Sequence, residues 1–393
     1  MTKINFDAVA LTQFLVRCPS ITPKDEGALK IVEDHLNEIG FKCNHLIFSD
    51  KDTADVNNLF GTIGSSGKHL AFAGHTDVVP IGNNSSWTYP PFSASIIEGK
   101  LYGRGVEDMK GGIACFISAT NSFIKKYGQN FGGQISFIIT GDEEKEAING
   151  TTKIMKWAEE KKIKFDQCIV GEPTSKKYIG DKIKIGRRGS INFFITIKGI
   201  QGHTANAHRS ENPIHHLLNL LNKILNKPLD NGNKHFLPTS IQIPTFDVGN
   251  PAANVIPEIA TATINIRFNN NHTGKSLEKW LKKHINELLS NSPKIECSFT
   301  SDQTGEAFLT KPGKLSNLIS EACKEINKTK INPELATDGG TSDARFIKNY
   351  CEVVEIGLIN KTLHQVDENV YIEDIKKLHD LYLLILEKYF NKI

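Results

Sequence analysis

Three short apolar runs in this chain each end in residues that bind metals or transfer protons. Residues 70–74 lead into His75 and Asp77, residues 135–141 lead into Glu143 and Glu144, and residues 168–171 lead into Glu172. Runs of this length, rich in β-branched and aromatic residues, are typical of buried strands. Because ligands of open α/β sheets gather beyond the carboxyl ends of the strands, we expect these side chains to lie at one sheet edge.

Two further residues complete a set of metal ligands. Asp108 lies in R-G-V-E-D-M-K-G-G and His364 lies in K-T-L-H-Q-V. Taken singly, such residues are often surface histidines or acids at helix N-termini, so the hypothesis depends on their joint occurrence. Two imidazoles and three carboxylates can hold two divalent cations that share a bridging carboxylate. The expected ligands are His75, Asp108, Glu144, Glu172 and His364.

The order of strand-like and helix-like segments predicts two domains, as the length of 393 residues also does. Up to residue 188 the two kinds of segment alternate, which is typical of an α/β domain with a helix-flanked, mostly parallel sheet. Residues 189–301 follow the order β-α-β-β-α-β of a ferredoxin-like α+β domain. Since His364 follows that segment, we expect the second domain to be inserted into the first, which resumes over residues 302–393.

The composition excludes several classes of protein. The net charge of +3 is spread along the chain without a long basic block, so nucleic-acid binding is not expected. The N-terminus M-T-K-I-N-F-D lacks the apolar core of a signal peptide, and no stretch is apolar enough for a membrane helix. Seven cysteines without a C-x-x-C pair indicate a reducing compartment, and hence the cytoplasm.

The motifs resemble those of the co-catalytic dizinc amidohydrolases and exopeptidases, a family that includes carboxypeptidase G-like enzymes, aminoacylases and acetylornithine deacetylase. G-H-T-D-V-V-P, Y-G-R-G-V-E-D-M-K-G-G, G-D-E-E and G-E-P-T occur across that family. A-I-N-G-T, G-R-R-G-S and G-G-T-S-D are narrower and indicate a branch that hydrolyses N-succinyl amino acids. The resemblance extends over nearly the whole chain.

This resemblance implies two Zn²⁺ ions per chain, for which Co²⁺ can substitute. Asp108 would bridge the two ions. His75 and Glu172 would complete one site, and Glu144 and His364 would complete the other. A cis peptide bond would follow Asp108.

The resemblance also implies the groups that act beside the metals. Glu143 would be the general base and acid, and Asp77 would orient His75. His203, in the inserted domain, would reach into the active site of the partner in a homodimer. Ala207 stands where relatives often have proline, which could loosen the loop that bears His203.

Arginines outside the metal set are candidates for binding carboxylates of the substrate, because the planar guanidinium matches a carboxylate in two places. Arg187, Arg188 and Arg267 are the main candidates, although Arg187 and Arg188 alone are equally well explained as a solvated turn. Weaker candidates are Ser190, Asn254, Gly340 and Thr341.

Two alternatives remain open at this point. Acetylornithine deacetylase or a general aminoacylase would share the fold and the metals and would differ only in the pockets for the acyl group and side chain. A catalytically inactive relative would act as a binding or scaffold protein. Such a relative typically loses a ligand or the base, and every one of them is present in this chain.

Overall fold

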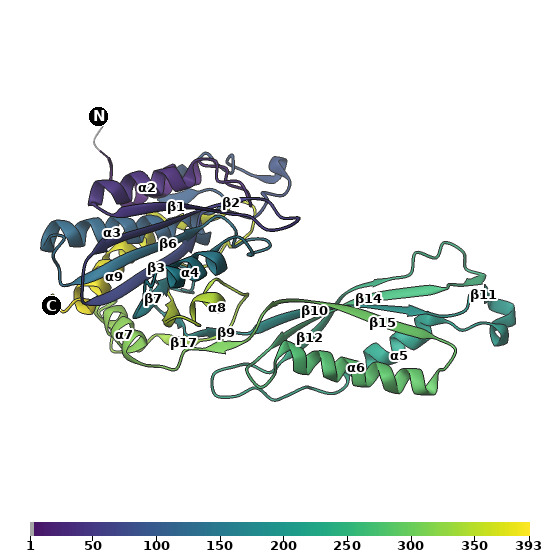
Figure 1. Ribbon diagram of the computed structural model, residues 1–393. Coiled ribbons are helices and arrows are strands. Elements are labelled where there is room, and N and C mark those ends of the chain that lie inside the picture. The colour runs from purple at the N-terminus through teal and green to yellow at the C-terminus, as the bar shows by residue number, and fades with distance from the viewer. Residues whose placement is uncertain (1–3) are drawn as a thin grey trace. The chain divides into compact units, whose positions relative to one another are not determined.

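The computed structural model describes residues 4–393, so the N-terminal sequence behind the expected absence of a signal peptide lies partly outside the described residues. The described chain divides into two compact units. Unit 1 comprises the chain up to residue 185 with residues 310–336 and 342–393, and unit 2 comprises residues 186–309 and 337–341. In Figure 1, unit 2 carries the teal and green middle of the colour scale. Among residues 4–393, no helix is both long and apolar enough to cross a bilayer.

Unit 1 contains an eight-stranded sheet, and the expected helix-flanked, mostly parallel architecture is confirmed. Its strands, in spatial order, are β1 (Lys42–Phe48), β2 (Val56–Gly64), β6 (Gly133–Thr140), β3 (Lys68–His75), β7 (Gln167–Val170), β18 (Glu352–Glu355), β8 (Lys182–Lys184) and β17 (Glu334–Ala336). The central strands β6, β3, β7 and β18 are parallel to one another. Seven of the eight residues of β3 are buried, as expected of a parallel strand covered on both faces.

Helices of unit 1 bury the apolar surface of this sheet. They are α1 (Ala8–Val16), α2 (Ala28–Ile39), α3 (Gly111–Tyr127), α4 (Thr151–Glu160), α7 (Lys314–Ile326), α8 (Ala344–Ile347) and α9 (Ile372–Tyr389). α3 packs against both α1 and α9, and α9 lies beside α3 in Figure 1. Phe72 of β3 stacks on Phe116 of α3 with ring centroids 4.2 Å apart, and Tyr382 of α9 meets both rings edge-on. This aromatic cluster fixes the sheet against the helices that follow the metal-ligand loops.

The strand register brings the expected site residues to one edge. His75, the last residue of β3, pairs with Thr140, the last residue of β6, and Ala73 pairs with Val170, the last residue of β7. Because these three strands are adjacent and parallel, the residues that follow them emerge side by side. The sequence-based expectation that they share an edge is confirmed.

Unit 2 has the ferredoxin-like order expected from the sequence. Its antiparallel sheet runs β12 (Ser240–Asp247), β14 (Ile259–Phe268), β10 (Gly189–Lys198) and β15 (Glu296–Gly305), with helices α5 (Pro213–Leu225) and α6 (Gly274–Asn291) in the two crossovers. Inward-facing residues of β10 and β14, including Phe193 and Ile264, form one core with Leu217 of α5 and Leu281 of α6.

Short elements complete the two units. In unit 1, β4 (Ser95–Ile97), β5 (Lys100–Tyr102) and β19 (Asn369–Tyr371) form a small sheet, and η1 (Asn84–Ser86) and η2 (Val106–Lys110) are single helical turns. In unit 2, β9 (Gly186–Arg187) pairs with β16 (Phe308–Leu309), β11 (Gly202–His203) pairs with β13 (Val255–Ile256), and η3 (Thr204–Arg209) is a 3₁₀ turn. The β9–β16 pair extends unit 2 beyond residues 189–301, the range expected for the inserted domain.

Candidate metal centre

The carboxylate of Asp108 faces one imidazole with each of its oxygens. Oδ1 lies 3.0 Å from Nε2 of His75, and Oδ2 lies 3.1 Å from Nε2 of His364. Asp108 is buried in η2, immediately before α3, and the peptide bond to Met109 is cis, as the family resemblance implied. One oxygen directed toward each histidine is the arrangement that a carboxylate needs to bridge two cations.

The other two expected ligands, Glu144 and Glu172, lie beside the same two histidines. Oε1 of Glu144 lies 3.2 Å from Nε2 of His364, and Oε1 of Glu172 lies 3.8 Å from Nε2 of His75. Two ligands that each lie ~2.0–2.1 Å from a tetrahedral zinc ion are roughly 3.3 Å from each other. Donor atoms of His75, Asp108 and Glu144 also lie within 4.8 Å of one another, as do those of His75, Glu143 and Glu172. The residues present therefore fit a pair of bound cations.

The acids around His75 and His364 raise the pKa values of both imidazoles. Burial lowers the pKa of His75, but the hydrogen bond to Asp108 and the surrounding carboxylates outweigh burial and raise it well above its usual value. Hydrogen bonds to Asp108 and Glu144 raise the pKa of His364 to about 10. Both imidazoles must lose a proton before Nε2 can bind a cation.

Asp77, which we expected to orient His75, contacts it through the backbone carbonyl. Nδ1 of His75 donates to the backbone carbonyl of Asp77 at 2.9 Å, whereas the nearer carboxylate oxygen lies 3.6 Å away. The carboxylate instead accepts the backbone N–H groups of Glu143 and Glu144, at 3.2 and 3.1 Å. Because Nδ1–H donates to this carbonyl, loss of the Nε2 proton leaves the Nε2 lone pair free for a cation, which is the tautomer that metal binding requires.

Glu143 has the environment of a proton acceptor. Burial raises the pKa of its carboxyl group well above the usual value, and the charges of Glu172 and Asp343 add to this effect against the opposing charge of His75. Nη1 of Arg345 lies 3.8 Å from its Oε1. A carboxylate that holds its proton more tightly than usual is a stronger base when it is ionised.

Asp343 and Arg345 were not identified from the sequence, although G-G-T-S-D-A-R-F contains both. Asp343 is buried and accepts a hydrogen bond from Oγ1 of Thr151 at 2.6 Å. Nε and Nη1 of Arg345 are buried without a hydrogen-bond partner among residues 4–393. Their position beside Glu143 depends on how α8 packs against α4, which the motif alone does not reveal.

A second pair of acids, also not identified from the sequence, ties together the loops that carry Asp108 and His364. Oε1 of Glu107 accepts both the N–H and the hydroxyl of Thr362, at 2.8 and 2.6 Å. Glu107 directly precedes Asp108, and Thr362 lies two residues before His364. Burial raises the pKa of Glu107 to about 8. We call this contact the Glu107–Thr362 bridge.

Glu368 holds the backbone of the segment that carries Glu107. Its buried carboxylate accepts the guanidinium of Arg104 at 2.6 Å and the N–H groups of Gly105 and Glu107 at 3.1 and 2.9 Å. Arg104 also stacks over Trp87, with 5.2 Å between the guanidinium carbon and the ring centroid. The only signal in the sequence was an acid four residues after His364, which is too common to be informative.

The expected substrate-binding residues lie in unit 2, where several come together. Arg187 is buried and donates through Nη1 to the carbonyl of Gly340 at 3.0 Å. Ser190 and Arg267 are directly opposite each other on β10 and β14. Burial and the positive charge of Arg188 lower the pKa of Arg267. Thr341 belongs to the same unit.

His203 and Asn254 form a second group in unit 2. Nδ1 of His203 accepts the N–H of Ala205 at 3.0 Å, and the N–H of Thr204 donates to the carbonyl of Asn254 at 3.1 Å. With Nδ1 acting as an acceptor, the neutral imidazole carries its proton on Nε2. The exposed His203 can therefore present a hydrogen-bond donor to another group.

Comparison with known proteins identifies the family. Residues 71–388 match peptidase family M20/M25/M40. The chain belongs to this family. A relative from Parvibaculum lavamentivorans named succinyl-diaminopimelate desuccinylase is 47% identical over 98% of this chain and 96% of its own length. One of the same name from Methylorubrum populi is 46% identical over 98% of both chains.

Solved M20 structures share the fold of this chain at much lower sequence identity. The Bacillus subtilis YXEP protein, described as a dinuclear metal binding peptidase from the M20 family, has a TM-score of 0.71 and 14% identity. The match covers 98% of both chains. Asp343, Arg345, Glu107 and Glu368 lie beside the candidate metal centre and were not identified from the sequence. They lie on a scaffold that this chain shares with distant relatives.

Proposed function

We propose that the protein hydrolyses N-succinyl-LL-2,6-diaminopimelate to succinate and LL-2,6-diaminopimelate, in the biosynthesis of lysine and peptidoglycan precursors. The placement of the Asp108 carboxylate between His75 and His364, with Glu143 beside them, is the observation that carries the reaction type. The names of relatives 46–47% identical over nearly the full length support the choice of substrate.

We propose two Zn²⁺ ions as the cofactors, with Co²⁺ as a substitute. His75, Asp108 and Glu172 would hold one ion, and Asp108, Glu144 and His364 the other. Bound there, the ions would acidify a water molecule and polarise the carbonyl of the substrate amide. The description of the YXEP protein as dinuclear supports two ions rather than one.

The residues of the chain would then move the proton. Glu143 takes a proton from the water as the new C–O bond forms, and it delivers that proton to the nitrogen as the C–N bond breaks. Asp77 keeps Glu143 in place through the backbone N–H that it accepts. The Nε2–H of His203 would donate to the oxygen that becomes negatively charged in the transition state.

Unit 2 supplies the groups suited to the substrate's three carboxylates. Arg187, Arg188 and Arg267 would bind them, since guanidinium groups form paired hydrogen bonds with carboxylates. Further substrate contacts are proposed for Ser190, Asn254, Gly340 and Thr341.

We further propose a cytoplasmic homodimer. Unit 1 would be the catalytic domain, and residues 189–301 of unit 2 would form the dimer interface. An edge strand of an antiparallel sheet offers unpaired backbone groups that a twofold-related copy can satisfy. In that dimer, His203 would complete the active site of the partner subunit.

A turnover assay with added Zn²⁺ tests the proposed reaction. N-succinyl-LL-2,6-diaminopimelate and N-acetylornithine should be compared side by side, with release of the free amine as the readout. We expect kcat/KM to favour the succinyl substrate strongly. A preference for N-acetylornithine would identify a deacetylase instead. If protein that binds two metals turned over neither substrate, the chain would be a catalytically inactive relative.

A further inference from the structure

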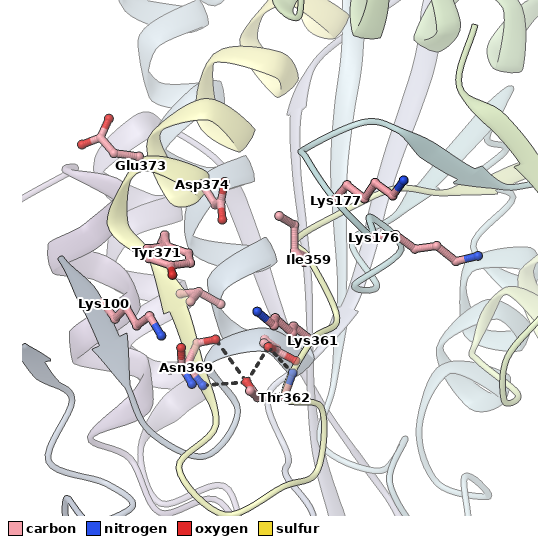
Figure 2. A pocket seen from close by; sticks show the side chains of 12 residues that line it. Lys100, Lys176, Lys177, Ile359, Lys361, Thr362, Asn369, Tyr371, Glu373 and Asp374 are labelled. Atoms are coloured by element: carbon pink, nitrogen blue, oxygen red, sulfur yellow. Dashed lines mark hydrogen bonds between the residues drawn. The ribbon is translucent and has the colours of Figure 1, made fainter. Parts of the chain in front are cut away.

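A cavity lies in unit 1, beside the loops that carry Asp108 and His364. Its volume is about 700 Å³, within the range of ~300–1,000 Å³ typical of small-molecule sites. None of the five candidate metal ligands lines it. Its walls are formed by Lys100, Glu107, Lys176, Lys177, Ile359, Lys361, Thr362, Asn369, Val370, Tyr371, Glu373 and Asp374 (Figure 2).

Charges of opposite sign are separated within this cavity. In Figure 2, the ammonium groups of Lys100 and Lys361 lie on either side of Asn369, whereas Asp374, a residue of α9, lies above them in the view. Neither Lys361 nor Asp374 has an ion-pair partner among the described residues, and Lys100 only lies over the ring of Tyr371, 4.9 Å from its centroid. Two other wall residues are ion-paired, Lys176 with Glu334 at 3.8 Å and Glu373 with Lys376 at 2.8 Å. Lys100, Lys361 and Asp374 are therefore charges that suit a ligand with complementary groups of both signs.

The wall nearest the metal centre also has an unsatisfied group. Glu107 is 1% exposed, and within residues 4–393 its Oε2 has no hydrogen-bond partner. Buried carboxyl oxygens are rarely left without a donor. A ligand ammonium at this wall would supply one.

This wall links the cavity to the metal centre. Thr362 donates to Glu107 in the Glu107–Thr362 bridge, and its hydroxyl accepts the N–H of Asn369 at 2.9 Å. The segment from Thr362 to Asn369 contains His364. A ligand that bonds to Glu107 or Thr362 competes with the bridge that holds His364.

We propose that this cavity binds a small amino dicarboxylate, with its carboxylates at Lys100 and Lys361 and an ammonium group at Asp374 or Glu107, and that binding lowers turnover through the His364 segment. The carboxylate and ammonium groups match the lysines and acids of the cavity walls. The inference rests on these charges and on the Glu107–Thr362 bridge, and binding can be measured independently of the reaction proposed above.

Calorimetric titration of the metal-loaded protein tests the binding. LL-2,6-diaminopimelate carries both kinds of charge, succinate carries only carboxylates, and 1,5-diaminopentane carries only ammonium groups. A Lys100→Ala/Lys361→Ala double variant removes two cavity charges, and Lys279→Ala/Lys282→Ala on α6 is the matched control. We expect the cavity variant to lose one binding event for LL-2,6-diaminopimelate, with affinity reduced at least tenfold, while the control retains it.

The two simpler probes and kinetics complete the test. Succinate and 1,5-diaminopentane should bind at least tenfold more weakly to the cavity than LL-2,6-diaminopimelate does. Inhibition by LL-2,6-diaminopimelate should include a fall in kcat that the cavity variant lacks, while turnover without inhibitor stays unchanged. Equal binding by cavity and control variants would overturn the site. Equally tight binding of succinate would overturn the ligand class, and binding without a change in kcat would overturn the link to His364.

Discussion

The carboxylate of Asp77 accepts the backbone N–H of Glu144 at 3.1 Å. Its other oxygen accepts the N–H of Glu143 at 3.2 Å, and its own carbonyl accepts Nδ1–H of His75 at 2.9 Å. One fully buried residue therefore positions a candidate ligand from β3, a candidate ligand after β6 and the proposed base. Asp77 acts as a positioning residue for three groups rather than only for one imidazole.

Replacing Asp77 with asparagine should loosen all three groups. One acceptor oxygen becomes an NH₂ group that faces a backbone N–H, and the negative charge near His75 is lost. We expect a ~10–100-fold loss of zinc affinity, as is typical when the support of a metal ligand is removed, together with lower kcat. Asp181→Asn is the control, because Asp181 also accepts two backbone N–H groups, at 2.8 Å each, but contacts no candidate ligand. Wild-type zinc affinity in Asp77→Asn would contradict this role.

Glu143→Gln should abolish turnover while leaving the metals in place. The amide has nearly the same shape but cannot accept a proton, and general-base catalysis typically contributes ~10²–10⁴-fold. Metal content should remain at two per chain, and higher pH should not restore activity because glutamine does not ionise. Steady-state kinetics with metal analysis provides the measurement. Activity within a few-fold of wild type would remove Glu143 from the reaction.

Zinc binding should release protons and strengthen as pH rises. The pKa of His364 is raised to about 10 and that of His75 well above its usual value, so both are protonated near pH 7 in the absence of metal. A cation must displace these protons, so apparent affinity should rise about tenfold per pH unit for each proton released. Calorimetry between pH 6 and 8, in buffers of different ionisation enthalpy, counts the protons. The His364→Ala variant should release one proton fewer than the wild type when zinc binds. Zinc affinity that does not change with pH would contradict the pairing of these histidines with acids.

Thr362→Val should weaken the Glu107–Thr362 bridge without disturbing the fold. Valine keeps the backbone donor but lacks the hydroxyl that contacts Glu107 at 2.6 Å, at a cost to stability of about 1 kcal/mol. Because His364 lies two residues away, we expect one of the two zinc ions to bind more weakly and the other to be retained. Thr120→Val, which removes a hydroxyl bonded to Phe116 within α3, is the control. Equal weakening of both ions, or of neither, would argue against the bridge as a support of His364.

Subunit mixing tests the proposed sharing of active sites. His203→Ala should lower kcat while zinc content and dimer mass stay unchanged, since its donor would act mainly in the transition state. When His203→Ala and Glu143→Gln proteins exchange subunits, one site of each heterodimer regains an intact Glu143 and an intact His203. Activity should reappear on mixing. Proven exchange without recovered activity, or a fully active wild-type monomer, would refute the shared site.

The strands and the ligand cluster could be predicted because each depends on a local pattern. Apolar runs of strand length end at Gly74, Gly141 and Gly171, and the following residues emerge at one edge of parallel strands. The prediction that the candidate ligands cluster therefore required little knowledge of the tertiary packing.

The supporting residues could not be predicted, because their partners are distant in sequence. Glu107 meets Thr362, and Arg104 meets Glu368, each across more than 250 residues. The bonding of the Asp77 carboxylate depends on the course of the backbone after β6, so its hydrogen bonds with the N–H groups of Glu143 and Glu144 could not be predicted from sequence spacing. The extent of unit 2 was likewise set by the pairing of β9 with β16, which involves only two residues from each strand.

The insertion of unit 2 separates the synthesis of the first part of unit 1 from that of its last part. Glu172 precedes the insertion and His364 follows it, as does β18, which fills the middle of the sheet between β7 and β8. Four of the five candidate ligands have been synthesised once the chain reaches Glu172, and His364 follows only about 190 residues later, some 10–40 s at bacterial elongation rates of ~5–20 residues per second. Throughout that interval β7 has an open edge, while the ferredoxin-like segment can already fold. The candidate metal centre can thus be completed only at the end of synthesis, and a chain terminated within the insertion would have an incomplete sheet and would lack His364.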